Sequence, residues 1–238
     1  MILCIDSGNT RLKWGLHDGG HWVMHGALPQ ADAVRLEQFL PAGVQPQKVM
    51  IANVAGSVIG AYIETTLQPW RQVTRHVVST AAACGVSNGY ARPEQLGVDR
   101  WCALIGARAM TQKPCLVVGC GTATTVDTLD EHGHFHGGLI LPGYGLMRWS
   151  LARNTAQLPL ASGDWHEHPD NTDDAIATGC LEAQVGAIER AFSRIAAHPG
   201  ATCLLFGGNA PRLSALLTCP HLNLDNLVLE GLRVLAEA

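Results

Sequence analysis

The first candidate for chemistry is an acidic turn at residues 6–10, DSGNT, which follows an apolar run at residues 2–5. Glycine lacks a Cβ, so backbone N–H groups at such a turn can approach a phosphate closely. The Asp6 carboxylate would repel that phosphate unless a cation lies between them, which makes Asp6 a candidate ligand for Mg²⁺ through water. Lys13 could help to neutralise phosphate charge. The alternative is a turn-capping Asp6 and a surface Lys13.

Two more glycine turns occur later in the sequence. Gly119 and Gly121 follow an apolar run at residues 115–118, and a Gly207-Gly208 pair occurs near the end of the chain. Neither the GxxxxGK[ST] motif of a Walker loop nor the GxGxxG motif of a dinucleotide fold is present. Each of these turns alone could also be a simple connection between strands.

The second candidate site is the segment Gly97-Val98-Asp99-Arg100. Gly97 precedes a predicted helix, so Asp99 and Arg100 would lie at the helix N-terminus, where the dipole favours anions. Phosphoryl transfer to an alcohol requires such a pair, because the Asp takes or orients the hydroxyl proton and the Arg holds an acidic substrate or developing charge. The alternative is that Asp99 is only the N-cap of the helix.

Histidines alternate on a predicted hairpin at His132, His134 and His136, which could place imidazoles on one face for a metal. No cysteine or carboxylate at ligand spacing completes the set. We therefore interpret the three side chains as a solvated strand face, and His166 and His168 as residues of a polar loop.

The elements that position the candidate residues form two similar sets. Residues 11–16 alternate between polar and apolar after the acidic turn, as in a half-buried strand. Strand-like residues also follow the second glycine turn, at 124–129. Residues 6–10 can be laid over residues 119–123, with apolar residues before both. The match indicates a duplicated unit, and therefore two similarly built lobes with a cleft between them.

We place the boundary between the lobes near a polar stretch that ends in a proline, residues 111–114. The expected N-terminal lobe, residues 1–113, carries the acidic turn and Asp99. The expected C-terminal lobe, residues 114–238, carries the other glycine turns. In that lobe Thr172 precedes two acidic residues, a pattern that predicts the start of a capped helix.

The composition narrows the class of protein. With 238 residues, 47% hydrophobic and 15% charged, the chain can bury a core without a metal or disulfide. A net charge of -4 argues against nucleic acid or anionic lipid as the main partner. The eight cysteines are scattered, mostly in apolar runs, as expected for buried thiols in a reducing compartment. Neither a signal peptide nor a membrane span is indicated, so we expect a cytoplasmic protein.

The order and spacing of these motifs resemble the type III pantothenate kinases, within the superfamily of acetate and sugar kinases, actin and heat-shock chaperones. The resemblance covers nearly the whole chain. It rests on the motifs at residues 6–13, Tyr90 with 97–100, 121–125, 137–143, 171–172 and 207–210. It implies an α/β fold of the actin-like, ribonuclease H-like type, with two similar lobes of mixed sheets flanked by helices.

The resemblance also implies an activity and the residues that carry it. The activity is ATP-dependent phosphorylation of pantothenate to 4'-phosphopantothenate, the first step of coenzyme A biosynthesis, with Asp99 as the proton acceptor and Mg²⁺ near Asp6. Family members are homodimers with the pantothenate pocket near the subunit interface, across which Thr172 could act. The implied ATP-binding residues are Asp6, Ser7, Gly8, Asn9, Thr10, Arg11, Leu12, Lys13 and Thr122. The implied pantothenate-binding residues are Tyr90, Gly97, Val98, Asp99, Arg100 and Thr172.

The chain departs from the family pattern at one position. Family members commonly carry an Asp two residues before the GTA motif, as a ligand for an activating K⁺ or NH₄⁺, and this chain has Gly119 there. Gly119 also corresponds to Asp6 in the internal repeat. A site for a monovalent cation is therefore in doubt. Two alternatives stay open: a related small-molecule kinase, and a regulatory or binding member of the fold that has lost turnover.

Overall fold

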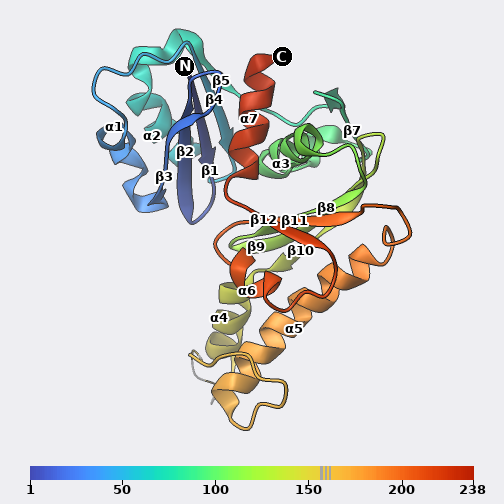
Figure 1. Cartoon of the computed structure of the whole chain (residues 1–238). Helices are drawn as coiled ribbons and strands as arrows, with labels where there is room; N and C mark the ends of the chain where they lie inside the picture. Colours follow the sequence, from blue (N-terminus) through green and yellow to red (C-terminus); the bar gives the residue numbers. More distant parts are fainter. Residues whose placement is uncertain (156–157, 159, 161) are drawn as a thin grey trace. The chain divides into compact units, whose positions relative to one another are not determined.

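The computed structural model describes residues 1–155, 158, 160 and 162–238 (Figure 1). The chain divides into two compact units. The first contains Met1–Gln112, His132–Phe135 and Asn226–Ala238, and the second contains Lys113–Glu131 and His136–Asp225. The main division lies beside the expected boundary, but the closing helix α7 (Leu227–Glu237) belongs to the first unit.

A five-stranded mixed sheet forms the centre of the first unit, in the order β3-β2-β1-β4-β5. Strand β1 pairs antiparallel with β2 and parallel with β4. Its apolar residues Leu3 and Ile5 are fully buried in the core, as the run at residues 2–5 predicts. The strands are β1 (Ile2–Ser7), β2 (Arg11–His17), β3 (Trp22–Pro29), β4 (Lys48–Asn53) and β5 (Thr74–His76).

Two helices of the first unit cross at very short distance because glycines stand at the contact. A Cβ added to Gly231 of α7 would lie 1.8 Å from the Cys102 carbonyl oxygen of α3 (Val98–Met110), and one added to Gly106 would lie 2.4 Å from the Leu227 oxygen. This packing explains why α7 joins the first unit. The other elements of the unit are η1 (Gln30–Arg35), α1 (Leu36–Phe39), α2 (Ser57–Thr66), η2 (Gln68–Val73), β6 (Ala82–Ala83), β7 (Val86–Asn88) and η3 (Pro93–Gln95).

The second unit repeats the strand order of the first. Its strands run β10-β9-β8-β11-β12, where β8 pairs antiparallel with β9 and parallel with β11. They are β8 (Cys115–Cys120), β9 (Ala123–Leu129), β10 (His134–Pro142), β11 (Thr202–Phe206) and β12 (His221–Leu224), and the first two residues of β10 belong to the first unit. The prediction of two similarly built α/β lobes with mixed sheets is confirmed.

The helices among the described residues of the second unit are α4 (Tyr144–Asn154), α5 (Thr172–Phe192) and α6 (Ala210–Ser214). The predicted helix start near Thr172 is confirmed, with Asn171 as the N-cap, because its side-chain oxygen accepts a hydrogen bond from the Asp174 N–H at 3.0 Å. Residues of α5 such as Val185 and Ile188 pack in the core of this unit.

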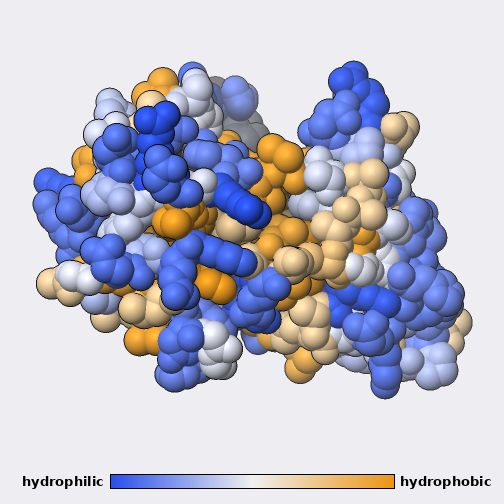
Figure 2. Space-filling model, turned by 90° about the horizontal axis from the view of Figure 1, so that it is seen from above, coloured by the Kyte–Doolittle hydropathy of each residue, from blue (hydrophilic) through white to orange (hydrophobic). Residues whose placement is uncertain are grey.

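The surface is mixed, as is usual for globular proteins. Figure 2 shows hydrophilic residues over most of one face, with hydrophobic residues gathered near its middle. Within the described residues, no helix has the length and apolar character needed to cross a membrane.

Candidate active site

The acidic turn joins β1 to β2 as a tight hairpin. Asp6 stands opposite Lys13 in the register of the two strands. The Gly8 N–H donates to the Arg11 carbonyl oxygen at 3.1 Å, and a Cβ on Gly8 would lie only 3.3 Å from that oxygen. The hairpin therefore brings a carboxylate and an ammonium group together beside a closely turned backbone.

Burial dominates the electrostatics of Asp6, whose residue surface is only 8% exposed. Loss of water raises the pKa of its carboxyl to about 7, Lys13 lowers it, and the negative charge of Asp99 raises it. Two segments far apart in the sequence thus meet in one electrostatic site. A cation near Asp6 would favour its ionised form.

Asp99 lies in the first turn of α3, where Gly97 is the N-cap. The interpretation of Asp99 as the N-cap is therefore wrong. Its Oδ1 accepts a hydrogen bond from the Arg100 N–H at 2.9 Å, and a Cβ on Gly97 would lie 2.8 Å from the same oxygen. Asp99 is partly exposed, so its carboxylate has access to solvent while the glycine leaves room for it.

Arg100 is buried beside two aromatic rings that contact each other. Its Nη1 donates to the Tyr90 hydroxyl at 3.0 Å, and its guanidinium carbon lies 5.7 Å from the Tyr90 ring centre and 5.8 Å from that of Phe135. Sequence reasoning missed Phe135. The sequence shows Phe135 as an apolar residue between His134 and His136. The structure adds that β10 pairs with β7 at this residue.

The remaining residues of the acidic turn divide into buried and exposed members. Ser7 is fully buried, and its hydroxyl accepts a hydrogen bond from the Gln30 side chain at 3.3 Å. Leu12 is fully buried in the core of the first unit. Asn9, Thr10 and Arg11 are exposed, so a ligand could reach them.

Three glycine segments converge around the β8–β9 turn in the second unit. The Gly121 N–H donates to the Ala123 oxygen at 3.0 Å, and the Asn209 N–H donates to the Cys120 oxygen at 3.0 Å. Gly207 has a φ of 102°, and a Cβ there would lie 2.6 Å from the Cys120 oxygen. A Cβ on Gly143 would lie 2.4 Å from the Gly121 oxygen. These glycines are required by the close approach of backbone segments.

The space beside Gly119 is crowded by two side chains. A Cβ at this residue would lie 2.8 Å from the Thr125 hydroxyl oxygen and 3.1 Å from Cζ of Phe206. Asp127 stands opposite Val117, two residues along β9 from the pair that Gly119 forms with Thr125.

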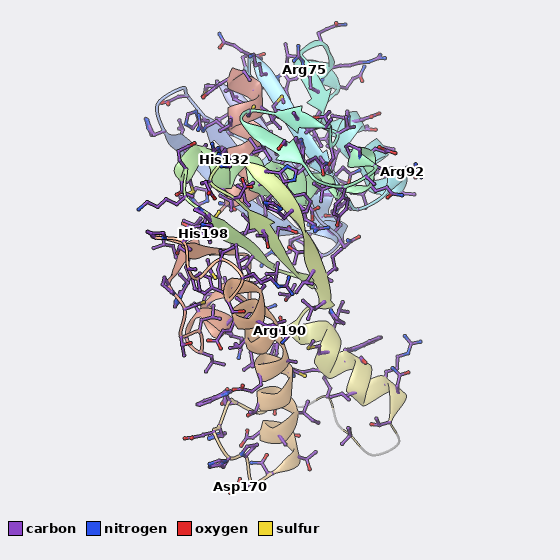
Figure 3. All side chains as sticks on the ribbon, turned by 90° about the vertical axis from the view of Figure 1, so that its right-hand side faces the viewer. Arg75, Arg92, His132, Asp170, Arg190 and His198 are labelled. Atoms are coloured by element: carbon purple, nitrogen blue, oxygen red, sulfur yellow. The ribbon has the colours of Figure 1, made fainter. Side chains whose placement is uncertain are left out.

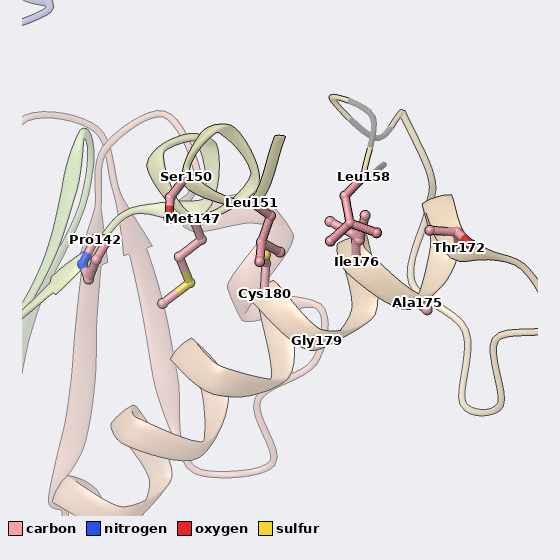
Figure 4. Close-up of a pocket in the computed structure, with 10 residues that line it drawn as sticks. All are labelled: Pro142, Met147, Ser150, Leu151, Leu158, Thr172, Ala175, Ile176, Gly179 and Cys180. Carbon is pink, nitrogen blue, oxygen red and sulfur yellow. The ribbon is translucent and has the colours of Figure 1, made fainter. Parts of the chain in front are cut away.

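Thr172 belongs to the second unit, at the start of α5, where it lines a cavity of about 550 Å³ between α4 and α5 (Figure 4). Apolar groups such as Met147, Leu151 and Ile176 make up most of the lining. Tyr90, Gly97, Val98, Asp99 and Arg100 belong to the first unit.

The alternating histidines take part in local polar contacts. His134 Nδ1 lies 2.9 Å from the Ser87 hydroxyl, and His136 Nε2 lies 2.7 Å from the Asp130 carboxylate. Over the described part of the chain, no group of three or more His, Cys, Asp or Glu side chains could hold a metal ion.

Comparisons with known proteins identify one family. The family model described as type III pantothenate kinase matches residues 2–194. A type III pantothenate kinase of Dechloromonas aromatica is 52% identical over 236 residues, which cover 99% of both chains. Another, from Aromatoleum aromaticum, is also 52% identical over 236 residues, with 99% of this chain and 98% of the relative covered.

Solved structures with little sequence identity share the fold. A protein from Sinorhizobium meliloti described as a 2-dehydro-3-deoxygalactonokinase aligns with a TM-score of 0.60 at 14% identity, covering 100% of this chain and 96% of the other. A glucokinase from an Antarctic psychrotroph aligns with a TM-score of 0.50 at 13% identity, covering 99% and 98%. These structures therefore share the two-lobed fold of this chain.

Proposed function

This chain belongs to the type III pantothenate kinase family, and we propose that Asp99 is the base of its reaction. The enzyme transfers a phosphoryl group from ATP to pantothenate, in the first step of coenzyme A biosynthesis. The observation that carries the assignment is the shared electrostatic site of Asp6, Lys13 and Asp99, in which Asp99 keeps access to solvent.

Asp99 would orient and accept the proton of the primary hydroxyl of pantothenate as that oxygen attacks the γ-phosphate in line. Arg100 would hold the pantothenate carboxylate, together with Tyr90, Gly97, Val98 and Thr172. The hydrogen bond from Arg100 to Tyr90 and the two flanking rings fix the guanidinium in advance, which supports this role.

The residues proposed to bind ATP are 6–13 on the first hairpin and Thr122 on the second. Lys13 would offset phosphate charge, and the exposed Asn9 and Thr10 would offer hydrogen bonds. Leu12 would act through the core, because its side chain is fully buried and supports the strand that carries Lys13.

Magnesium fits the first hairpin. Mg²⁺ binds through one or two carboxylates plus waters and phosphate oxygens, and Asp6 provides one carboxylate whose burial makes a neighbouring cation favourable. When bound, the ion supplies charge stabilisation to the phosphates. Asp6 would hold it, either directly or through water.

A monovalent cation does not fit the second hairpin in the same way. Gly119 stands where the usual carboxylate ligand would be, and the space beside it is crowded by the Thr125 hydroxyl and the Phe206 ring. We therefore propose a kinase whose activity depends little on K⁺ or NH₄⁺.

The enzyme would act in the cytoplasm, where ATP is available, as a homodimer. Exposed apolar side chains on α4, Leu146 and Trp149, and the adjoining apolar cavity beside Thr172 support contact with a second copy. In such a dimer Thr172 could contribute to the pantothenate pocket of the other subunit.

The variant Asp99→Asn tests the proposed base. It should lower kcat by about 10³-fold, since proton transfer by a positioned group contributes on the order of 10²–10⁴. ADP affinity, measured by calorimetry, should stay near the wild-type value. Near-normal turnover would refute the base role, and a wild-type protein that binds ADP without phosphorylating pantothenate would indicate a binding protein instead.

A further inference from the structure

Two arginines of the second unit lie over the same buried aromatic ring. The guanidinium carbon of Arg148, on α4, lies 5.1 Å from the ring centre of Tyr144, and that of Arg212, on α6, lies 5.4 Å from it. The Tyr144 residue is only 4% exposed, so the ring forms a fixed base for both cations. Arg212 is itself exposed to solvent.

The charge of this cluster is not compensated by the protein. Among the described residues, neither Arg148 nor Arg212 has an ion pair with a carboxylate within 4.0 Å. The Nε atom of Arg148 is buried and has no hydrogen-bond partner in the described part of the chain. Two like charges near one ring repel each other, and a buried donor without a partner costs free energy. Both effects would be relieved by an anion.

The cluster is anchored on the turn that carries Thr122. Tyr144 follows Gly143, whose N–H donates to the Thr122 oxygen at 2.9 Å. The Arg212 N–H donates to the Asn209 oxygen at 3.1 Å, and the Asn209 N–H donates to the Cys120 oxygen at 3.0 Å.

Both helices that carry the arginines thus begin at the glycine segments described above. The Gly121 and Gly207 segments follow the carboxyl ends of the parallel strands β8 and β11, which is where open α/β sheets bind their ligands, and the Gly143 segment follows β10.

We propose that Arg148 and Arg212 bind the phosphate chain of the nucleotide. The inference rests on the proposed nucleotide site at Thr122 and adds two residues that determine affinity there. A guanidinium donates paired hydrogen bonds that match a phosphate, whereas the neutral adenine would leave the two charges uncompensated. The affinity for the ligand should therefore grow with its number of phosphates.

Calorimetric titration of the full chain with adenosine, AMP and ADP tests the site. Arg212→Gln should weaken ADP binding about tenfold, or about 1.4 kcal/mol, because the phosphate loses a charge-assisted hydrogen bond. AMP binding should weaken less, and adenosine binding should not change. Arg212→Lys, which keeps the charge without the fork, should lie between Gln and the wild type.

The matched control is Arg190→Gln, which removes the same charge from an exposed position on α5 (Figure 3). ADP should bind this variant as it binds the wild type. Arg148→Gln should also weaken ADP binding, with thermal unfolding measured to confirm that the variant folds. The exposed Arg212 keeps the test valid if Arg148→Gln does not fold.

Equal ADP affinity in Arg212→Gln and Arg190→Gln would overturn the proposal and leave the kinase assignment intact. Equal losses for adenosine and ADP would also overturn it, because the arginine would then contact the base. If the wild-type protein binds no ADP at all, the nucleotide site at Thr122 and the arginine site fail together.

Discussion

The hairpins β1–β2 and β8–β9 occupy the same place in two sets of five strands with the same order, yet they differ at one cross-strand pair. Asp6 stands opposite Lys13 in the first hairpin, and Gly119 stands opposite Thr125 in the second. The first hairpin carries a carboxylate opposite an ammonium group, whereas the backbone of the second hairpin lies close to the Gly143 and Gly207 segments. The same strand framework therefore carries a charged pair in one unit and close backbone contacts in the other.

The largest difference between the two hairpins should appear in activity when the carboxylate charge of the first hairpin is removed. Asp6→Asn should lower kcat/KM for MgATP by about 100-fold, because the proposed cation loses its carboxylate near the phosphates. Steady-state kinetics with varied Mg²⁺ would measure the loss. A fall of less than about twofold would contradict a role for Asp6 in nucleotide binding.

The pH dependence of the wild-type enzyme should report the same carboxyl group. Burial raises the pKa of Asp6 to about 7 in the protein without ligand, so the protonated, neutral form dominates below that pH. The form that attracts a cation is the ionised one. We expect kcat/KM for MgATP to rise with pH and level off above about 7, and this limb should disappear in Asp6→Asn.

The second hairpin should respond to backbone crowding. Gly207→Ala would place a Cβ 2.6 Å from the Cys120 oxygen at a residue with a φ of 102°, and so it should raise the KM for ATP by roughly tenfold and lower the Tm. Gly208→Ala is the matched control, because a Cβ there has no atom within 4 Å. Equal values of the KM for ATP and of the Tm in the two variants would show that the crowding at Gly207 affects neither ATP binding nor stability.

The smallest effect is expected at the aromatic support of Arg100. Phe135→Leu removes one of the two rings beside the guanidinium and should raise the KM for pantothenate about threefold to tenfold, in keeping with roughly 0.5–2 kcal/mol for such a contact. The KM for ATP should change much less. A change in both KM values of the same size would indicate a general loss of packing.

Local patterns predicted much of the fold and the charged part of the site. The apolar runs before Asp6 and Gly119 predicted the two hairpins, and Gly97 predicted the start of α3. These features depend on neighbours in the sequence, such as the alternation of side chains and the glycine at a turn.

The features that the sequence did not predict depend on contacts between distant segments. Helix α4 begins in a Pro-Gly-Tyr-Gly stretch that reads as a loop, and Phe135 lies beside Arg100 only because β10 pairs with β7. Helix α7 joins the first unit through Gly106 and Gly231, whose contact cannot be read from either helix alone. Arg148 and Arg212 are separated by 63 residues in the sequence, and no sequence pattern predicts that both lie over the Tyr144 ring.

The most direct test of the contrast between the hairpins is a coupled assay of pantothenate phosphorylation by the wild-type enzyme, titrated with KCl or NH₄Cl at constant ionic strength. The crowding beside Gly119 by Thr125 and Phe206 predicts nearly the same rate at every concentration of either ion. A strong, saturable requirement for K⁺ or NH₄⁺ would contradict the account, because it would show that the second hairpin region holds a cation without the carboxylate.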